Sequence, residues 1–220
     1  MNLDQNDPAF AGQAAYTRRL LWVYDAMVYG FNSPILWRCS RKELIEHYNE
    51  HVSACHLDIG VATGGLLNAC RFPTDSPAIT LMDLNANSLG SAAQRLQRYA
   101  PAIHQADVLK PWGLPPESFE SVAMNYLLHC LPGDIREKSI VFDHARDALS
   151  SEGTLFGATV LSRGVRQTGL SKRALRTMNR RGIFDNLADD AADLDASLSR
   201  VFSTHVIKLQ GSVALFAARV

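Results

Sequence analysis

Cysteine is scarce in this sequence, and its spacing excludes the commonest metal and disulfide patterns. The 220 residues contain 4 cysteines, at Cys39, Cys55, Cys70 and Cys130, and none of them forms a C-x-x-C pair. These spacings match no zinc-site pattern, so we expect no metal ion. Scattered thiols in a chain of this size are typical of reduced, partly buried cysteines in a cytoplasmic protein.

Long apolar runs are also absent. Because a membrane-spanning helix needs a run of about 18 or more apolar residues, and no such run is present, we expect no membrane span. Residues 1–8 are polar and carry two aspartates, which does not fit the apolar core of a secretory signal peptide. The sequence therefore predicts a cytoplasmic protein.

Neither sign of charge is in excess. The chain has 22 lysines and arginines against 22 aspartates and glutamates, so its formal net charge is zero. No overall field attracts nucleic acid or an anionic membrane, and we expect a small-molecule partner and no nucleic acid. Hydrophobic residues make up 47% of the chain, enough for the core of one α/β domain. The oligomeric state stays open, a homodimer included.

Segments with the pattern of strands alternate with segments of helical spacing along the middle of the chain. The expected strands are 55–59, 78–84, 102–108, 118–126 and 153–161, and the expected helices between them are 65–72, 87–99 and 134–149. This alternation predicts an α/β fold with a parallel sheet covered by helices on both faces. Two final strands, 204–209 and 213–219, are close enough to form an antiparallel hairpin that closes the sheet.

Helical segments also flank this core. Helical spacing over 11–29 is followed by Gly30-Phe31-Asn32-Ser33-Pro34, where we expect a break, with Ser33 as N-cap of a second helix that ends near Tyr48. The expected organisation is an N-terminal helical cap (1–52), a cofactor-binding core (53–161), a helical insertion or lid (162–200) and the C-terminal hairpin (201–220).

A glycine-rich loop, Asp58-Ile59-Gly60-Val61-Ala62-Thr63-Gly64-Gly65, follows the first expected strand. Ligands of such sheets bind beyond the carboxyl ends of the strands, where glycines let the backbone approach them. The loop alone is ambiguous. It fits the dinucleotide pattern G-x-A-x-x-G, and it also fits D-x-G-x-G-x-G with Ala62 in place of the middle glycine.

Three carboxylates favour one cofactor over the other. Asp58 would repel a pyrophosphate, but it suits S-adenosylmethionine, which carries a sulfonium and an ammonium and no phosphate. Asp83, at the end of the second expected strand, can accept hydrogen bonds from both ribose hydroxyls. Asp107, at the end of the third, can accept from an adenine amino group while Val108 packs on the ring.

With these residues the chain resembles the class I S-adenosylmethionine-dependent methyltransferases over residues 55–161 and the C-terminal hairpin. The segment Tyr24-Asp25-Ala26-Met27 is also similar to the entry segment of the ubiquinone/menaquinone C-methyltransferases. The resemblance implies a Rossmann-like, seven-stranded, mostly parallel sheet with an antiparallel C-terminal hairpin. It implies that the cofactor is bound by Asp58, Gly60, Ala62, Thr63, Gly64, Asp83, Leu84, Asp107, Val108, Asn125 and Tyr126.

Methyl transfer is an in-line displacement, so the protein has to align the acceptor and exclude water. A base is needed only if the acceptor arrives protonated, and His129, after the fourth expected strand, is the catalytic candidate. A backbone hydrogen bond in a loop and acceptor positioning are its alternative roles. The candidates for binding the acceptor are Tyr16, Tyr24, Tyr29, Asn32, Trp37, Asn179 and Phe184.

The expected insertion has split charge. A basic group comes first, followed by an acidic group: Lys172, Arg173, Arg176, Arg180 and Arg181, then Asp185, Asp189, Asp190, Asp193 and Asp195. Two surface helices explain this pattern, and so do arginines that hold an acidic acceptor. The function predicted overall is methyl transfer to a small molecule, in biosynthesis of a quinone or another secondary metabolite. A non-catalytic cofactor-binding module and an NAD(P)-dependent oxidoreductase are the alternatives.

Overall fold

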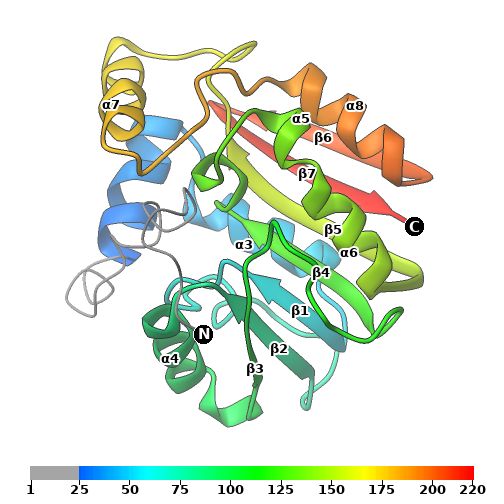
Figure 1. Cartoon of the computed structure of the whole chain (residues 1–220). Helices are drawn as coiled ribbons and strands as arrows, with labels where there is room; N and C mark the ends of the chain where they lie inside the picture. The colour runs from blue at the N-terminus through cyan, green and yellow to red at the C-terminus, as the bar shows by residue number, and fades with distance from the viewer. Residues whose placement is uncertain (1–24) are drawn as a thin grey trace.

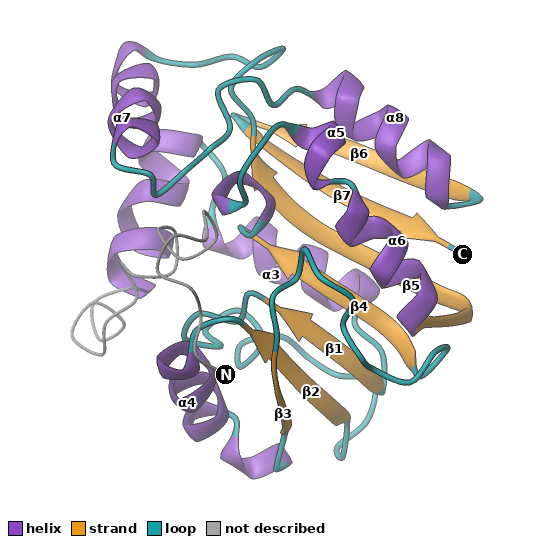
Figure 2. Ribbon diagram, in the orientation of Figure 1, coloured by secondary structure: helices purple, strands orange, loops and turns teal. Residues whose placement is uncertain are grey.

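A seven-stranded sheet forms the centre of the molecule in the computed structural model, which describes residues 25–220 (Figures 1 and 2). The strand order is β3-β2-β1-β4-β5-β7-β6. Neighbours among the first five strands are parallel, whereas β7 runs antiparallel to β5 and to β6. The strands are β1 (Cys55–Ile59), β2 (Ala78–Asp83), β3 (Ala102–Gln105), β4 (Phe119–Asn125), β5 (Leu149–Val160), β6 (Thr204–Gln210) and β7 (Val213–Arg219). The predicted fold class is confirmed.

Helices cover both faces of this sheet. One face carries α3 (Arg41–His51) and α4 (Ala86–Arg95), and the other carries α5 (Ile135–Lys138), α6 (Ile140–Ala148) and α8 (Ala191–Val201). Alternate strand residues supply the two cores, so Asp58 lies on the α3 face and its neighbours Leu57 and Ile59 lie on the α6 face. Two short 3₁₀ turns, η2 (Gln97–Tyr99) and η3 (Leu128–Cys130), complete this part of the chain.

Two further helices lie side by side at the end of the sheet where the parallel strands finish. The helix η1 (Ala26–Trp37), a wide π-type helix, packs against α7 (Gly169–Arg180), although about 140 residues separate them along the chain (Figure 1). Within residues 25–220, no helix is long and apolar enough to cross a membrane. The four cysteines are free thiols, with Cys39 and Cys70 buried.

The break predicted at Gly30–Pro34 is wrong. The helix η1 runs through this segment, and Ser33 does not cap a helix, because its hydroxyl donates to the carbonyl oxygen of Cys39 at 2.6 Å. The second helix begins later, with Ser40 as N-cap and Glu43 completing a capping box.

Three other predicted boundaries are also corrected. The helix predicted over 65–72 is not formed: residues 65–69 form consecutive turns, with the amide of Asn68 bonded to the carbonyl of Gly64 and that of Cys70 to Leu66. The helix predicted over 87–99 ends at Arg95. The helix predicted over 134–149 is divided into α5 and α6 at Ser139, whose hydroxyl bonds back to a carbonyl of the preceding turn.

The C-terminal hairpin is confirmed, with a loop one residue shorter than predicted. Gln210 pairs with Val213, so only Gly211 and Ser212 connect the strands. Gly211 has φ +60°, and a Cβ on it would lie 2.2 Å from the carbonyl oxygen of Trp37. That same carbonyl accepts a hydrogen bond from the amide of Ser212 at 2.8 Å. The turn therefore holds the end of η1, and with it Trp37, against the sheet.

Candidate active site

The glycine-rich loop turns sharply at the carboxyl end of β1. Gly60, Ala62 and Gly64 all have positive φ, at +70°, +46° and +68°. Gly60 donates to the carbonyl oxygen of Met82, which ties the loop to the end of β2, and a Cβ on Gly60 would lie 3.0 Å from Leu127 Cδ1. Ala62 adopts the left-handed conformation without being glycine, at a cost on the order of 1 kcal/mol. The loop is thus a strained concave turn of the kind that receives a ligand.

Thr63 anchors this loop instead of facing outwards. Its side chain is 1% exposed, and its hydroxyl donates to Asp25 Oδ1 at 2.5 Å. The guanidinium of Arg95, in the last turn of α4, pairs with the same carboxylate and also reaches the Thr63 hydroxyl. Asp25 was not among the predicted site residues, although it lies in the segment that carried the second family resemblance. Asp25 therefore joins the start of η1, the loop and α4.

Asp58 lies at the base of the loop, 5% exposed. Its Oδ2 accepts a hydrogen bond from the Tyr48 hydroxyl at 2.6 Å. Burial raises the pKa of Asp58 to about 7, the negative charge of Asp83 adds to the rise, and the Tyr48 hydrogen bond opposes it. Two carboxylates that disfavour each other's ionisation form a site suited to a cationic ligand.

Asp83 ends β2 and faces the same loop. Burial raises its pKa to about 6, against the lowering effect of backbone N–H groups from Asn85 and from the loop residues Ala62 and Val61. The Asn85 amide donates to Oδ1 at 2.8 Å. Leu84, which follows, is half-buried, and its carbonyl oxygen accepts a hydrogen bond from the Gln105 side chain.

Asn125 is the clearest sign that a ligand belongs here. It ends β4, next to β1 in the sheet, and is 9% exposed. Both polar atoms of its side chain, Oδ1 and Nδ2, are buried without a hydrogen-bond partner anywhere in residues 25–220. Because a buried amide without a partner costs about 1–3 kcal/mol, this side chain is suited to hydrogen-bond a ligand bound at the end of β4.

The third predicted carboxylate is engaged within its own turn. The strand β3 ends at Gln105, earlier than predicted, so Asp107 lies in the turn that follows. Its Oδ1 accepts from the Leu109 amide at 3.0 Å and its Oδ2 pairs with Lys110 Nζ at 3.1 Å. Val108 is buried in the core on the α6 face.

A cavity of about 500 Å³ lies between η1 and α7, beyond the end of β4. Its lining is largely apolar, with Asn32, His129, Arg173, Thr177 and Arg181 among the polar exceptions. Of the predicted residues, Asn32, Trp37, Tyr126, His129 and Phe184 line it. Sequence reasoning did not single out Val28, Leu36, Val160, Leu170 or Ala174, which have no local pattern that separates them from ordinary core residues.

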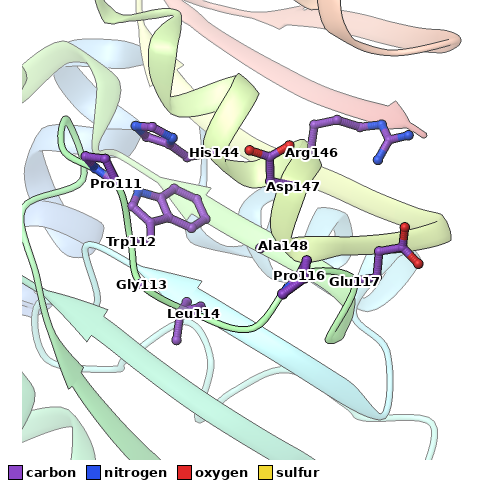
Figure 3. A pocket seen from close by; sticks show the side chains of 10 residues that line it. All are labelled: Pro111, Trp112, Gly113, Leu114, Pro116, Glu117, His144, Arg146, Asp147 and Ala148. Carbon is purple, nitrogen blue, oxygen red and sulfur yellow. The ribbon is translucent and has the colours of Figure 1, made fainter.

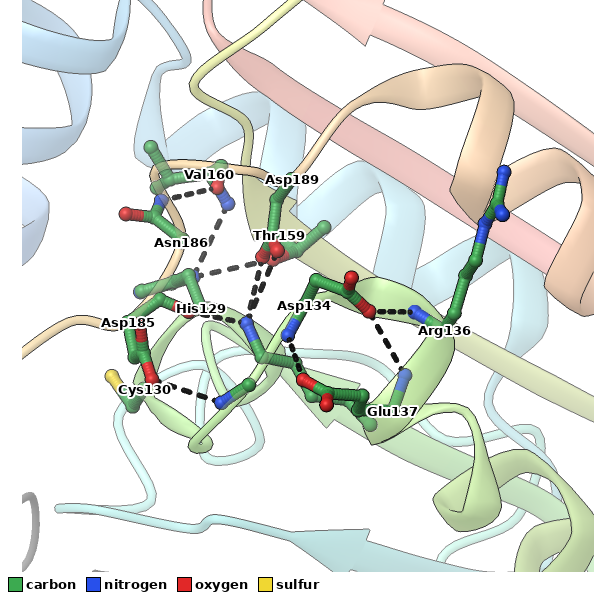
Figure 4. Close-up of polar contacts among 12 residues, drawn as sticks. His129, Cys130, Asp134, Arg136, Glu137, Thr159, Val160, Asp185, Asn186 and Asp189 are labelled. Carbon is green, nitrogen blue, oxygen red and sulfur yellow. Dashed lines mark hydrogen bonds and ion pairs between the residues drawn. The ribbon is translucent and has the colours of Figure 1, made fainter.

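His129 faces this cavity with one nitrogen committed elsewhere. The residue is 3% exposed, and its Nδ1 accepts a hydrogen bond from the backbone amide of Val160 at 3.2 Å (Figure 4). Burial, and to a lesser degree the charge of Lys138, lower the pKa of His129 to about 3. The ring packs edge-on against Phe184, with centroids 4.3 Å apart. His129 is therefore neutral, and its Nε2 carries the proton.

Tyr126 directly follows β4 and lines the cavity. It has φ +59°, and its ring stacks on Tyr29 with centroids 6.4 Å apart. Its hydroxyl lies 2.5 Å from the Ser33 hydroxyl. Because the Ser33 hydroxyl already donates to the carbonyl oxygen of Cys39, Tyr126 is the donor of the bond between the two hydroxyls. Burial raises the pKa of Tyr126 well above its ordinary value.

Four residues predicted to bind the acceptor are not among the described residues that line the cavity. Asn179 does not line the cavity, because its amide is bonded to Asn186 and to the carbonyl of Leu175. Tyr29 lies behind Tyr126 and does not line the cavity either. Tyr16 and Tyr24 lie outside the described residues.

Other features do not coincide with this site. A hollow of about 380 Å³ lined by Trp112, His144 and Asp147 lies where β4 and β5 begin, at the opposite end of the strands (Figure 3). On α3, His47, Glu50 and His51 place one ligand atom each within 4.8 Å of one another. The absence of a metal thus stays a prediction.

Comparisons with known proteins agree with this geometry. Residues 57–155 match the family model described as a methyltransferase domain. The chain is 41% identical to demethylluteothin O-methyltransferase of Streptomyces thioluteus, over 94% of this chain and 90% of that protein. It is 37% identical to an N-methyltransferase of Penicillium aethiopicum, over 83% of this chain and 76% of that protein. The solved N-methyltransferase NodS of Bradyrhizobium japonicum, bound to S-adenosylhomocysteine, has TM-score 0.58 at 16% identity, over 81% and 84%.

The fold and the site at the ends of β1, β2 and β4 define a cofactor-dependent transferase. The chain belongs to the S-adenosylmethionine-dependent methyltransferases that act on small molecules. The residues present fit this cofactor. Asp58 offers a carboxylate to its cationic end and Asp83 offers one to its ribose hydroxyls, Gly60 and Gly64 supply the positive φ angles of the turn, and the Asn125 amide has both hydrogen-bonding atoms available.

Proposed function

We propose that the protein methylates a small, largely apolar acceptor bound in the cavity between η1 and α7. The observation that carries the proposal is the position of Tyr126. This residue lines the cavity, and the neighbouring Asn125 offers an unpartnered amide at the end of β4. Consecutive residues at one strand end thus face an acceptor pocket and a cofactor pocket, which is the placement that transfer between two bound molecules needs.

In the cofactor pocket, Asp58 and Asp83 hold the cationic methionine end and the ribose, and the Asn125 amide supplies a donor and an acceptor. The adenine is assigned to the turn at Asp107 and Val108, with Leu84 beside it. When bound, S-adenosylmethionine supplies a methyl group already activated by its sulfonium. The turns at Gly60 and Gly64 let the backbone approach the bound molecule closely.

In the acceptor pocket, the protein orients its substrate and excludes water. Trp37 and Phe184 lie with centroids 6.0 Å apart and form one apolar wall. The Nε2–H of His129 and the amide of Asn32 are among the polar groups that can fix one end of the acceptor. Holding the reacting atoms in line is worth several kcal/mol of the barrier, so this positioning is the protein's main contribution.

Oxygen is the acceptor atom that we propose, in a polyketide-like or quinone-like secondary metabolite. The O-methyltransferase relative matches the chain over almost its whole length and at higher identity than the N-methyltransferase relative. A cavity with aromatic walls also suits a flat, conjugated molecule. A cytoplasmic location and a homodimer stay predictions from the sequence.

Calorimetry on one phenylalanine variant tests the acceptor site. Phe184→Ala removes a ring from the cavity wall, and Phe72→Ala is the matched control, since Phe72 is similarly half-buried against Tyr99 and lines no part of the cavity. We expect Phe184→Ala to weaken binding of a naphthoquinone probe about tenfold while S-adenosylhomocysteine binds as before. Equal probe binding by both variants would contradict the proposed acceptor site.

A further inference from the structure

We infer that the acceptor enters this cavity as an anion: a small, largely apolar acid whose hydroxyl ionises near neutral pH, such as an enol or a phenol conjugated to an electron-withdrawing group. The inference rests on the proposed function and names the substrate class of that site. The cavity holds cationic groups and proton donors, and its described lining holds no group placed to remove a proton.

The first support is the lack of a base among the described residues that line the cavity. No aspartate or glutamate is among them. Burial raises the pKa of Tyr126, and its hydroxyl donates a hydrogen bond to the Ser33 hydroxyl. The thiol of Cys130 donates to the carbonyl oxygen of Tyr126 at 3.8 Å. Neither group is available as a base towards the cavity.

The sequence made His129 the candidate base, but in the structure its Nε2–H is a hydrogen-bond donor. The Val160 amide occupies the lone pair of Nδ1, so the neutral ring keeps its proton on Nε2, the nitrogen left for the cavity. The Thr159 hydroxyl lies 3.4 Å from the same Nδ1, and the ammonium of Lys138, paired with Asp189, further disfavours a second proton on the ring. Removing a proton from the acceptor would require a free Nε2 lone pair, which this tautomer lacks. Donation from Nε2–H to an oxyanion needs no rearrangement.

The second support is a pair of arginines at the cavity. Arg173 and Arg181 line it, both are exposed, and neither has an ion-pair partner within residues 25–220. None of the five aspartates that follow them in sequence forms an ion pair with them. Asp189 pairs with Lys138, Asp193 pairs with Arg136, and Asp195 lies 2.8 Å from His205 Nε2. Asp185 accepts a hydrogen bond from the Gly133 amide, and Asp190 caps α8. The described lining therefore carries two positive charges and no negative one.

These features suit an acceptor that is already ionised. An electron pair of the acceptor oxygen forms the new bond to the methyl carbon, and the electron pair of the carbon–sulfur bond passes to sulfur. No proton is released in this step, so no base is required. The methylated product is neutral and loses the attraction of the arginines and of the His129 donor, which favours its release.

The test uses 4-nitrophenol, which ionises near neutral pH and whose anion absorbs visible light, and its neutral methyl ether, 4-nitroanisole. Both are titrated into protein saturated with S-adenosylhomocysteine. We expect binding to lower the pKa of 4-nitrophenol by about one unit, seen as added phenolate absorbance at a fixed pH. We expect the anion to bind about tenfold tighter than the ether.

The test variant is the double substitution Arg173→Gln with Arg181→Gln. The control is Arg176→Gln, because Arg176 lies on α7 and is exposed but does not line the cavity. The double variant should lose about tenfold in affinity for the phenolate and little for the ether, and the control should lose neither. Equal losses for both probes, or no pKa change on binding, would overturn the inference and leave the acceptor site standing. Failure of both probes to bind the parent protein would overturn the acceptor site as well.

A pH profile gives an independent outcome. For a series of phenols of increasing acidity, the pH at which turnover reaches half its maximum should follow the pKa of each free phenol. With S-adenosylmethionine kept saturating at every pH, so that the titration of Asp58 does not limit turnover, a half-maximum at the same pH for every phenol would identify a base on the protein and refute the inference.

Discussion

The affinity for the cofactor should depend on pH through Asp58. This carboxyl has a pKa raised to about 7, mainly by burial, and a cation bound beside it favours its ionised form. If only the ionised form binds, the apparent affinity scales with the ionised fraction, which rises from roughly 3% at pH 5.5 to roughly 75% at pH 7.5. Through Asp58 alone, S-adenosylhomocysteine, whose ammonium keeps its charge over this range, should therefore bind about 25-fold more weakly at pH 5.5 than at pH 7.5, and the titration of Asp83 adds to this dependence.

Isothermal titration calorimetry across this range measures the effect. Asp58→Asn keeps an oxygen to accept the Tyr48 hydroxyl, but it cannot ionise. We expect this variant to bind S-adenosylhomocysteine more weakly than the parent at pH 7.5. Its affinity should keep only the pH dependence due to Asp83, which is about fourfold between pH 5.5 and 7.5 for a pKa near 6. Asp75→Asn, in an exposed loop, is the control and should behave as the parent. Constant parent affinity from pH 5.5 to 7.5, or a dependence in Asp58→Asn as large as that of the parent, would refute the reasoning.

The same shift has an opposite effect on stability. Because the folded pKa of Asp58, about 7, lies above its ordinary value of 3.8, ionisation opposes folding. This destabilisation is absent below pH 3.8, grows as the pH rises and is complete above pH 7. Asp58→Asn should therefore raise the unfolding free energy at pH 7.5, by about 1–4 kcal/mol, while it weakens cofactor binding. A site residue shows this combination, and a purely structural residue does not.

Two other variants separate ligand binding from stability. Asn125→Ala loses no hydrogen bond within the described residues, so we expect little change in its unfolding free energy. Its affinity for S-adenosylhomocysteine, measured by calorimetry, should fall by about 1–2 kcal/mol. A variant that unfolds readily but binds normally would contradict this. Lys138→Met leaves the buried carboxylate of Asp189 without its ion pair and should cost about 3–5 kcal/mol at pH 7.5 by urea unfolding. Because burial raises the pKa of Asp189 to about 6, the cost should shrink at pH 5, where this carboxyl is mostly protonated, and Lys138→Met with Asp189→Leu should recover much of it.

The sheet was predictable because its signals are local. The strand 55–59, which ends in a glycine loop, was predicted with the bounds that the structure has, and the alternation of strands and helices predicted that the strands of the sheet core are parallel. Errors fell where tertiary contacts override local preference. Ser33 and Pro34 have the pattern of a helix start, but the hydroxyl of Ser33 is used by Cys39 and Tyr126.

The site was predictable in part for the same reason. Asp58, Asp83 and Asn125 end strands, so their positions at one edge of the sheet follow from the pattern. The role of Thr63 did not, because Asp25 and Arg95 reach it from η1 and α4. Asn179 was assigned to the acceptor for its residue type, whereas its amide is used by Asn186.

The sequence by itself therefore determined the sheet, the glycine loop and the carboxylates that define the cofactor, since each depends on periodicity or on a few consecutive residues. Only the tertiary structure decided the acceptor pocket. Its walls come from η1 and α7, which are distant in sequence, and the tautomer of His129 depends on the Val160 amide of a different strand. The charge of the pocket was decided in the same way, because the acidic residues that follow Arg173 and Arg181 find their partners elsewhere in the fold.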